Sequence, residues 1–376
     1  MSIFSSKSSY VGVDIGSSSI KMVELANYKG RPRLVTYGFT EKKLDEWSSS
    51  DFVGDVSIMV STISEIYKKS RISSKKVIAA LPNFSVFTAI LNLPQMPKKE
   101  LDSAISWEAK KIIPMPLEEI ILDWKIISES ENYESSADSG EGIPQIEDLG
   151  QQAGSLKKIF SKSRKNLKVL LTGASKNLVR KYMDIFSQTG LTLLSLETES
   201  FALIRSLIGN DKSVIMVVDL GATTSSIMVV ERGIPVLTRS IEIGGMMITR
   251  SISNTLNVNL DRAEQFKQDM MLNSQTAENS LPQTVERSFA AILNEIKYTI
   301  NLYQDQHNKK IEKVVLAGGC SLLGNLSGYL SRVLNINTYI GDPWARVIFP
   351  TELKPILDRL GTKFAVAIGL AMRDIE

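Results

Sequence analysis

VGVDIGSS, from Val11 to Ser18, is the most informative stretch of this sequence, because it returns as MVVDLGAT from Met216 to Thr223. Each copy is an apolar run followed by Asp, one apolar residue, Gly and small residues. The apolar run predicts a buried strand, and the Gly allows a tight turn that lets successive N–H groups and hydroxyls face one point. A second strand ending in Glu follows each copy, at Glu24 and Glu231. We therefore expect two similar hairpins, one in each half of the chain.

Two such hairpins facing each other would hold the phosphates of a nucleotide between two lobes. The Asp at each strand end, Asp14 and Asp219, can hold Mg²⁺ through water. One hairpin alone is weak evidence, because Asp-x-Gly-Ser is also common turn chemistry. The repetition favours a phosphate site.

A third element, VVLAGGCSLL from Val314 to Leu323, predicts a strand, a double-Gly turn and a helix. A backbone without side chains at Gly318 and Gly319 allows close approach of a flat ligand to a helix N-terminus. The alternative is a Gly-rich strand–helix connection that binds nothing.

Apolar periodicity predicts the remaining elements. Helices are expected at 52–69, 97–113, 177–188, 199–208, 321–333 and 364–373, and over most of 254–304 with a break near 273–283. Strands are expected at 11–16, 20–25, 76–81, 91–93, 120–127, 169–173, 214–220, 227–230 and 314–317.

Length and composition exclude several classes of protein. The 376 residues are enough for two or three domains, and 43% apolar with 23% charged residues is ordinary for a globular chain. The 44 basic and 41 acidic residues leave a charge of +3, which does not argue for nucleic-acid binding. One Cys and one His, Cys320 and His307, cannot form an internal disulfide or a Cys/His zinc cluster. We expect His307 to be an ordinary residue at a helix end.

The composition changes sharply at residues 129–165. Residues 129–155 contain seven acidic and no basic side chains, and residues 157–168 contain six basic and no acidic ones. We expect a flexible loop here, with collapse of the two charged segments or docking to a partner as the alternative.

The first ten residues are polar, and the longest apolar runs are far shorter than the ~20 residues of a membrane-spanning helix. We therefore expect a cytoplasmic protein without direct membrane insertion. If it acts at a membrane, another protein must hold it there.

In this order, the three elements resemble the phosphate-1, phosphate-2 and adenosine motifs of the actin, chaperone and sugar-kinase ATPases. Five separated segments, 11–25, 93–124, 169–205, 218–267 and 366–373, also resemble the PilM family of type IV pilus assembly proteins, relatives of FtsA. The resemblance implies an α/β actin-like ATPase fold of two lobes with a small α+β subdomain inserted in the first. The first lobe would be 9–82, 191–210 and 364–376, the insert 83–190, and the second lobe 211–363 with a helical part at 249–307.

The resemblance also implies an ATP and Mg²⁺ site. Its cofactor-binding residues would be Asp14, Gly16, Ser17, Ser18, Lys21, Asp219, Gly221, Thr223, Thr224, Glu264, Lys267, Gly318, Gly319, Ser321 and Leu323, with Asp14 and Asp219 at the metal. Two of these assignments have alternatives: Lys21 as an exposed strand residue, and Glu264 with Lys267 as a surface ion pair.

Glu197 stands where chaperone-like members of the superfamily carry the acid that orients the attacking water. Glu199 is the competing candidate, and either could instead cap the following helix. Because hydrolysis in this superfamily depends on positioning and metal, weak or absent ATPase turnover fits every motif.

The function implied is a nucleotide-binding scaffold of type IV pilus, type II secretion or competence assembly. Its partner would be the cytoplasmic N-terminal peptide of a PilN-like inner-membrane protein, bound near 81–87 and 112–116 between first lobe and insert. Pilus assembly ATPases and a second copy of the chain are further partners that the resemblance suggests. One alternative is an FtsA-like polymerising membrane-associated ATPase, but we expect no terminal anchor helix in this chain. Another is a sugar kinase, which the short insert disfavours, or a chaperone, for which the chain is too short.

Overall fold

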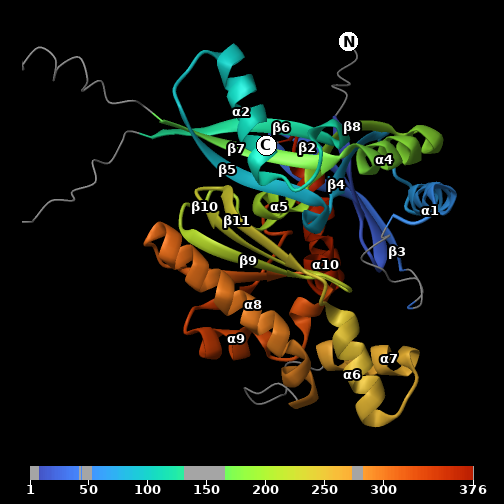
Figure 1. The fold of residues 1–376 in the computed structure, drawn as a ribbon. Coiled ribbons are helices and arrows are strands. Elements are labelled where there is room, and N and C mark those ends of the chain that lie inside the picture. Colours follow the sequence, from blue (N-terminus) through green and yellow to red (C-terminus); the bar gives the residue numbers. More distant parts are fainter. Residues whose placement is uncertain (1–7, 42–43, 45–52, 131–165, 273–282, 376) are drawn as a thin grey trace, which may run out of the picture. The chain divides into compact units, whose positions relative to one another are not determined.

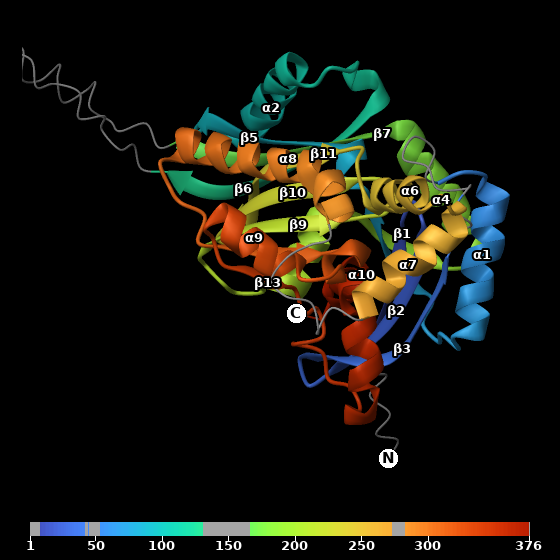
Figure 2. The ribbon, with the colours of Figure 1, turned by 90° about the horizontal axis from the view of Figure 1, so that it is seen from below.

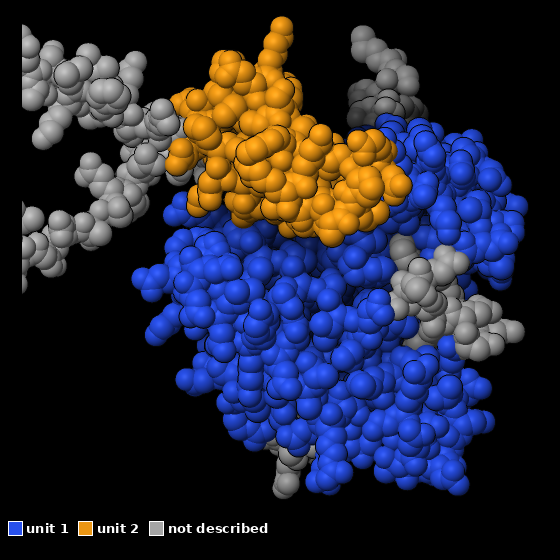
Figure 3. Space-filling view, viewed as in Figure 1, with its two compact units in different colours: residues 1–86, 174–376 blue, residues 87–173 orange. Residues whose placement is uncertain are grey.

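The computed structural model describes residues 8–41, 44, 53–130, 166–272 and 283–375 (Figure 1). They form two compact units, shown in blue and orange in Figure 3. The larger unit takes the described residues up to Val86 and those from Ala174 onward, and the smaller unit is Phe87–Gly173. The expected loop at 129–165 lies outside the described residues except for its first two positions, which end a strand.

The first sheet of the larger unit has the strand order β3-β2-β1-β4-β8. Its strands are β1 (Ser9–Ile15), β2 (Ser19–Tyr28), β3 (Arg31–Glu41), β4 (Lys76–Leu81) and β8 (Thr192–Thr198). The first three are antiparallel neighbours, and β4 and β8 extend the sheet in parallel. Helices α1 (Val56–Lys69) and α4 (Lys176–Thr189) lie side by side and share an apolar core with this sheet (Figures 1 and 2).

The second sheet repeats this arrangement in the order β11-β10-β9-β12-β13. Its strands are β9 (Val214–Leu220), β10 (Ser225–Glu231), β11 (Ile234–Ile241), β12 (Lys313–Ala317) and β13 (Thr338–Ile340). As in the first sheet, an antiparallel three-stranded part is extended by two parallel strands. The sequence repeat is therefore a repeat of the fold, with β1–β2 corresponding to β9–β10.

Four helices complete the second half. They are α6 (Gly245–Leu256), α7 (Leu260–Leu272), α8 (Gln283–His307) and α9 (Leu326–Leu334). α6 and α7 lie side by side (Figures 1 and 2). His307 ends α8 as expected and stacks on Tyr303, with ring centroids 4.7 Å apart.

Two helices pack between the sheets: α5 (Glu199–Leu203), which continues as a π-helical turn to Ile208, and α10 (Lys354–Met372). α10 approaches β1 so closely that a Cβ at Gly12 would lie 1.9 Å from the carbonyl oxygen of Ala367. Only glycine allows this contact. It connects α10 to β1, the strand that carries Asp14.

The smaller unit contains α2 (Lys98–Ile112), β6 (Ile120–Ser130) and all but the end residues of β5 (Val86–Pro94) and β7 (Asn166–Ser175), with the strand order β5-β7-β6. Leu101, Ile105 and Ala109 on α2 pack with apolar residues of the three strands. This unit is narrower than the insert expected at 83–190, because α4 buries Tyr182, Ile185 and Phe186 in the core of the first sheet.

Most predicted elements are present, with three corrections. The final helix begins at Lys354, ten residues before the predicted start, and Pro355 fits in its first turn, where no backbone N–H is needed. The predicted helix at 321–333 is a 3₁₀ turn at Gly319–Leu322 followed by α9, whose cap Asn325 accepts from Gly328 N–H. α6 begins at Gly245, before the predicted 254. The sequence did not predict β3, β8, β11 or β13.

Candidate functional site

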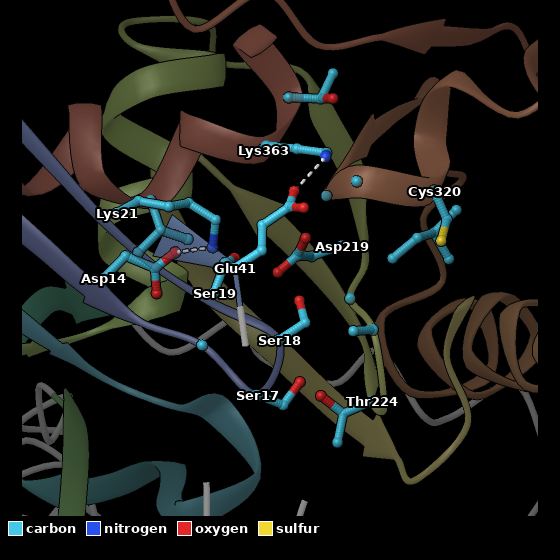
Figure 4. A pocket seen from close by; sticks show the side chains of 18 of the residues that line it. Asp14, Ser17, Ser18, Ser19, Lys21, Glu41, Asp219, Thr224, Cys320 and Lys363 are labelled. Atoms are coloured by element: carbon cyan, nitrogen blue, oxygen red, sulfur yellow. Dashed lines mark hydrogen bonds and ion pairs between the residues drawn. The ribbon is translucent and has the colours of Figure 1, made fainter. Parts of the chain in front are cut away.

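The two repeated hairpin turns have the same hydrogen bond. Gly16 N–H donates to Ser19 O at 2.9 Å after β1, and Gly221 N–H donates to Thr224 O at 3.0 Å after β9. The Gly in each copy closes a turn that leaves the following residues facing a common space. In Figure 4, Ser17 and Ser18 of the first turn and Thr224 of the second face each other across a pocket.

The pocket has a volume of about 510 Å³ and lies within the larger unit. Twelve of the sequence-predicted site residues line it: Asp14, Gly16, Ser17, Ser18, Lys21, Asp219, Gly221, Thr224, Glu264, Lys267, Gly318 and Gly319. Its size is in the range of small-molecule and cofactor sites. The structure thus brings together residues from four segments of the chain, 14–21, 219–224, 264–267 and 318–319.

Lys21 lies beside Asp14 because the two are opposite each other in the β1–β2 ladder. Lys21 Nζ is 2.8 Å from Asp14 Oδ2, and their side chains are 13% and 7% exposed. Lys21 is therefore not the exposed strand residue of the alternative interpretation. Lys21 is a nearly buried cation in the pocket wall.

Acidic groups concentrate around Asp14. Asp219, at the end of β9, has its pKa raised to about 6, first by burial and then by the Asp14 carboxylate, against the opposing effect of Lys21. Glu199, at the start of α5, has its pKa raised to about 8 by burial and by the carboxylates of Asp14 and Asp219. Glu199 Oε2 accepts a hydrogen bond from Asn83 N–H at 2.9 Å. A bound cation would favour the ionised forms of Asp219 and Glu199.

Glu264 and Lys267, three positions apart on α7, are joined at 2.7 Å. Lys267 is only 2% exposed and also donates to Thr249 Oγ1 at 2.8 Å and to Gly245 O at 3.2 Å. Thr249 Oγ1 donates in turn to Glu264 Oε2 at 2.6 Å. The pair is therefore no surface ion pair. It is a buried network that positions the Glu264 carboxylate at the pocket.

The double-Gly turn requires glycine at Gly318, where φ is +82° and a Cβ would lie 2.4 Å from Leu220 O. Two predicted residues of this element support the turn and do not line the pocket. Ser321 Oγ donates to Gly318 O at 2.8 Å, and Leu323 is buried in the core of the second half.

Glu197 and Thr223 also do not line the pocket. Arg205 donates to Glu197 Oε2 and Oε1 at 3.0 and 3.1 Å, and Arg373 Nε is 2.9 Å from Oε1. Glu197 is thus held by two arginines, whereas Glu199, the competing candidate for the water-orienting acid, lines the pocket. The Thr223 hydroxyl is buried and has no hydrogen-bond partner among the described residues.

Sequence reasoning missed Glu41, Phe84, Thr362 and Lys363, which line the pocket from β3, the 3₁₀ turn after β4 and α10. Nothing in the local pattern marks Glu41, because β3 itself was not predicted. Thr362 and Lys363 lie inside α10, well after its start at Lys354, so no helix-end pattern marks them.

The residues fit a nucleotide with a hydrated metal ion. Within the described ranges, no group of three or more His, Cys, Asp or Glu side chains is placed to hold a metal directly. Asp14 and Asp219 could still hold Mg²⁺ through water, and their mutual repulsion would be relieved by the ion. Thr362 lines the pocket, and its buried Oγ1 has no hydrogen-bond partner among the described residues. A bound ligand could supply that partner. No described helix is long and apolar enough to cross a membrane.

Comparisons with known proteins agree with this architecture. The family model described as type IV pilus assembly protein PilM matches residues 12–139 and 155–375. A solved structure of the PilM–PilN type IV pilus biogenesis complex is 24% identical, with a TM-score of 0.76, and 98% of each chain is covered. The ethanolamine utilization protein EutJ from Carboxydothermus hydrogenoformans is 14% identical, with a TM-score of 0.53, and the match covers 97% of this chain and 89% of EutJ. The predicted α/β actin-like ATPase fold of two lobes is confirmed.

Proposed function

We propose that this chain, which belongs to the PilM family of type IV pilus assembly proteins, is a scaffold that binds ATP and Mg²⁺ between its two lobes. The observation that carries this proposal is the pair of repeated hairpins that face each other across one pocket, each with an Asp at its strand end (Figure 4). Opposed turns of this kind offer backbone N–H groups and hydroxyls to an anion from two sides. A polyphosphate with a bound cation matches that arrangement.

Each part of the pocket suits one part of the nucleotide. Ser17, Ser18 and Thr224 would contact phosphate oxygens, together with the Lys21 ammonium. Asp14 and Asp219 would hold the water shell of Mg²⁺, which neutralises the phosphates. Glu264, positioned by Lys267, would accept from the ribose hydroxyls, and the turn at Gly318–Gly319 would lie against the base.

Glu199 is the residue placed to orient a water molecule if ATP is hydrolysed. Its carboxyl group faces the same pocket as Asp14 and Asp219, and Asn83 N–H fixes one of its oxygens. Since phosphoryl transfer depends on positioning and electrostatics, slow turnover or simple retention of ATP both suit a scaffold.

The partner that we propose is the cytoplasmic N-terminal tail of a PilN-like inner-membrane protein. The matched structure described as the PilM–PilN complex supports this choice. A protein held in this way would work at the cytoplasmic face of the inner membrane through its partner. Binding of the tail would depend on nucleotide if the lobes respond to both ligands.

Two measurements test the proposal. Calorimetry should detect ATP–Mg²⁺ binding to the purified chain, and a synthetic PilN-like tail should capture the chain in a pull-down with and without ATP–Mg²⁺. A tail of the same composition in scrambled order is the control. Absence of nucleotide binding would overturn the ATP site, and equal capture by the scrambled tail would overturn the partner.

A further inference from the structure

Glu41 and Lys363 form an ion pair at the pocket that belongs to neither hairpin motif (Figure 4). Lys363 Nζ donates to Glu41 Oε1 at 3.3 Å, although the two residues are 322 positions apart. Glu41 ends β3, an edge strand of the first sheet, and Lys363 lies on α10. The pair therefore connects the sheet edge to α10 beside the space where a ligand would lie.

Lys363 is the pocket lysine whose ion pair is most accessible to a ligand. The described residues that line the pocket include three lysines, and each has a carboxylate partner. Lys21 and Lys267 are 13% and 3% exposed and have pair distances of 2.8 and 2.7 Å, whereas Lys363 is 34% exposed and its partner Glu41 is 51% exposed. An ion pair this exposed contributes little to stability. A bound anion can therefore take over Lys363 more easily than the other two lysines.

α10 also contacts the double-Gly turn directly at this point. Gly318 N–H donates to Thr362 O at 3.1 Å, and a Cβ on Gly319 would lie 3.5–4.0 Å from the Lys363 side-chain carbons. The Thr362 hydroxyl is buried, lines the pocket and has no hydrogen-bond partner among the described residues. A buried hydroxyl without a partner is costly unless a ligand or water supplies one. Thr362 and Lys363 thus present a hydroxyl and an ammonium group to the same pocket.

We propose that Thr362 and Lys363 are nucleotide-binding residues, and that Glu41 holds Lys363 until the nucleotide displaces it. This inference rests on the proposed ATP site. On binding, the Lys363 ammonium exchanges the Glu41 carboxylate for an acceptor on the nucleotide, and the Thr362 hydroxyl gains its missing partner. Glu41 is then a competitor of the ligand, and the Glu41–Lys363 pair opens when the pocket fills.

The competition predicts opposite effects for the two partners. Lys363→Met should weaken ATP–Mg²⁺ binding by about threefold or more, because a charge-assisted contact is lost. Glu41→Gln should tighten binding about twofold or more, because Lys363 is released from its competitor. In the double variant Glu41→Gln/Lys363→Met, the affinity should equal that of Lys363→Met alone, because no Lys363 remains to be released. Calorimetry at constant ionic strength measures all four dissociation constants.

α10 offers a matched control. Lys354 and Asp358 form an ion pair on the same helix at 3.0 Å, with 57% and 50% exposure, and neither lines the pocket. Lys354→Met and Asp358→Asn make the same charge changes and should leave the ATP affinity unchanged. Lys363→Arg should retain most of the affinity, because it keeps the charge.

The outcomes separate this inference from the proposed function. Suppose that the wild-type chain binds ATP–Mg²⁺. If Glu41→Gln then weakens binding, or if Glu41→Gln and Lys363→Met both bind like the controls, the exchange is wrong and the ATP site stands. If the wild-type chain does not bind, the proposed function itself fails. If Lys363→Met does not fold by circular dichroism, Glu41→Gln and Lys363→Arg still decide: loss of affinity in Glu41→Gln overturns the exchange.

Discussion

Arg205 holds Glu197 through two hydrogen bonds of 3.0 and 3.1 Å, and this pairing keeps the Glu197 carboxylate out of the pocket that Glu199 reaches two residues later. Glu197 is the last but one residue of β8, and Glu199 begins α5. Glu199 lines the pocket, whereas Glu197 does not.

Glu199 should make the chain less stable as the pH rises. Its pKa in the folded chain is about 8, above its ordinary value of 4.5, so folding retains a proton that the unfolded chain releases. The free energy of unfolding should therefore fall between about pH 4.5 and pH 8, by up to about 1.4 kcal/mol for each unit of pKa difference. Glu199→Gln should flatten this dependence in urea titrations at pH 5 and pH 8. The same slope in variant and wild type would contradict the assignment.

Glu197→Gln should act on stability and leave nucleotide affinity unchanged. The variant weakens the pairing with Arg205 and Arg373, two partly buried guanidinium groups, and should cost on the order of 2 kcal/mol. Chemical denaturation measures this loss. A marked fall in ATP–Mg²⁺ affinity without loss of stability would return Glu197 to the binding site.

Both hairpins should be needed for nucleotide binding, since each supplies one side of the pocket. Asp14→Ala or Asp219→Ala should weaken ATP–Mg²⁺ binding at least about tenfold, which corresponds to about 1.4 kcal/mol. Asp358→Ala on the surface of α10 is the control, and Asp219→Asn checks the same point with an isosteric side chain. Unchanged calorimetric affinity in both Ala variants would rule out the two-hairpin site.

ATP–Mg²⁺ binding should release protons near neutral pH. Asp219 and Glu199 have pKa values raised to about 6 and about 8, and a nearby cation favours their ionised forms. The affinity should therefore rise from pH 6 to pH 8. Calorimetry in two buffers of different ionisation enthalpy counts the protons released, and proton uptake on binding would contradict the prediction.

Residues 131–165 should be dispensable for folding. Their composition contains too few apolar residues to form a core, and changing a loop's length costs only ~0.6 kcal/mol per doubling. Replacing them with a short Gly/Ser linker should leave the melting temperature within a few degrees. A large drop in the melting temperature would show that they pack against the rest of the chain.

Much of the site was predictable because local patterns encode it. The strand followed by Asp-x-Gly forms the same turn in both copies, so the repeat of residues 11–18 at 216–223 indicated both halves of the pocket. Glu197 could not be distinguished from Glu199 in this way. The two lie two positions apart, and the partner that removes one of them from the pocket, Arg205, is recognisable only when the helix is in place.

The sequence by itself determined the two hairpins, the double-Gly turn and the family, because these depend on the order of residues along short segments. The tertiary structure decided which distant side chains meet. Glu41 reaches Lys363 because β3 is an edge strand of the first sheet and α10 packs against β1, where Gly12 admits the Ala367 carbonyl. The burial that raises the pKa of Asp219 and Glu199 arises in the same way. Such effects depend on packing between segments hundreds of residues apart, and no local pattern records that packing.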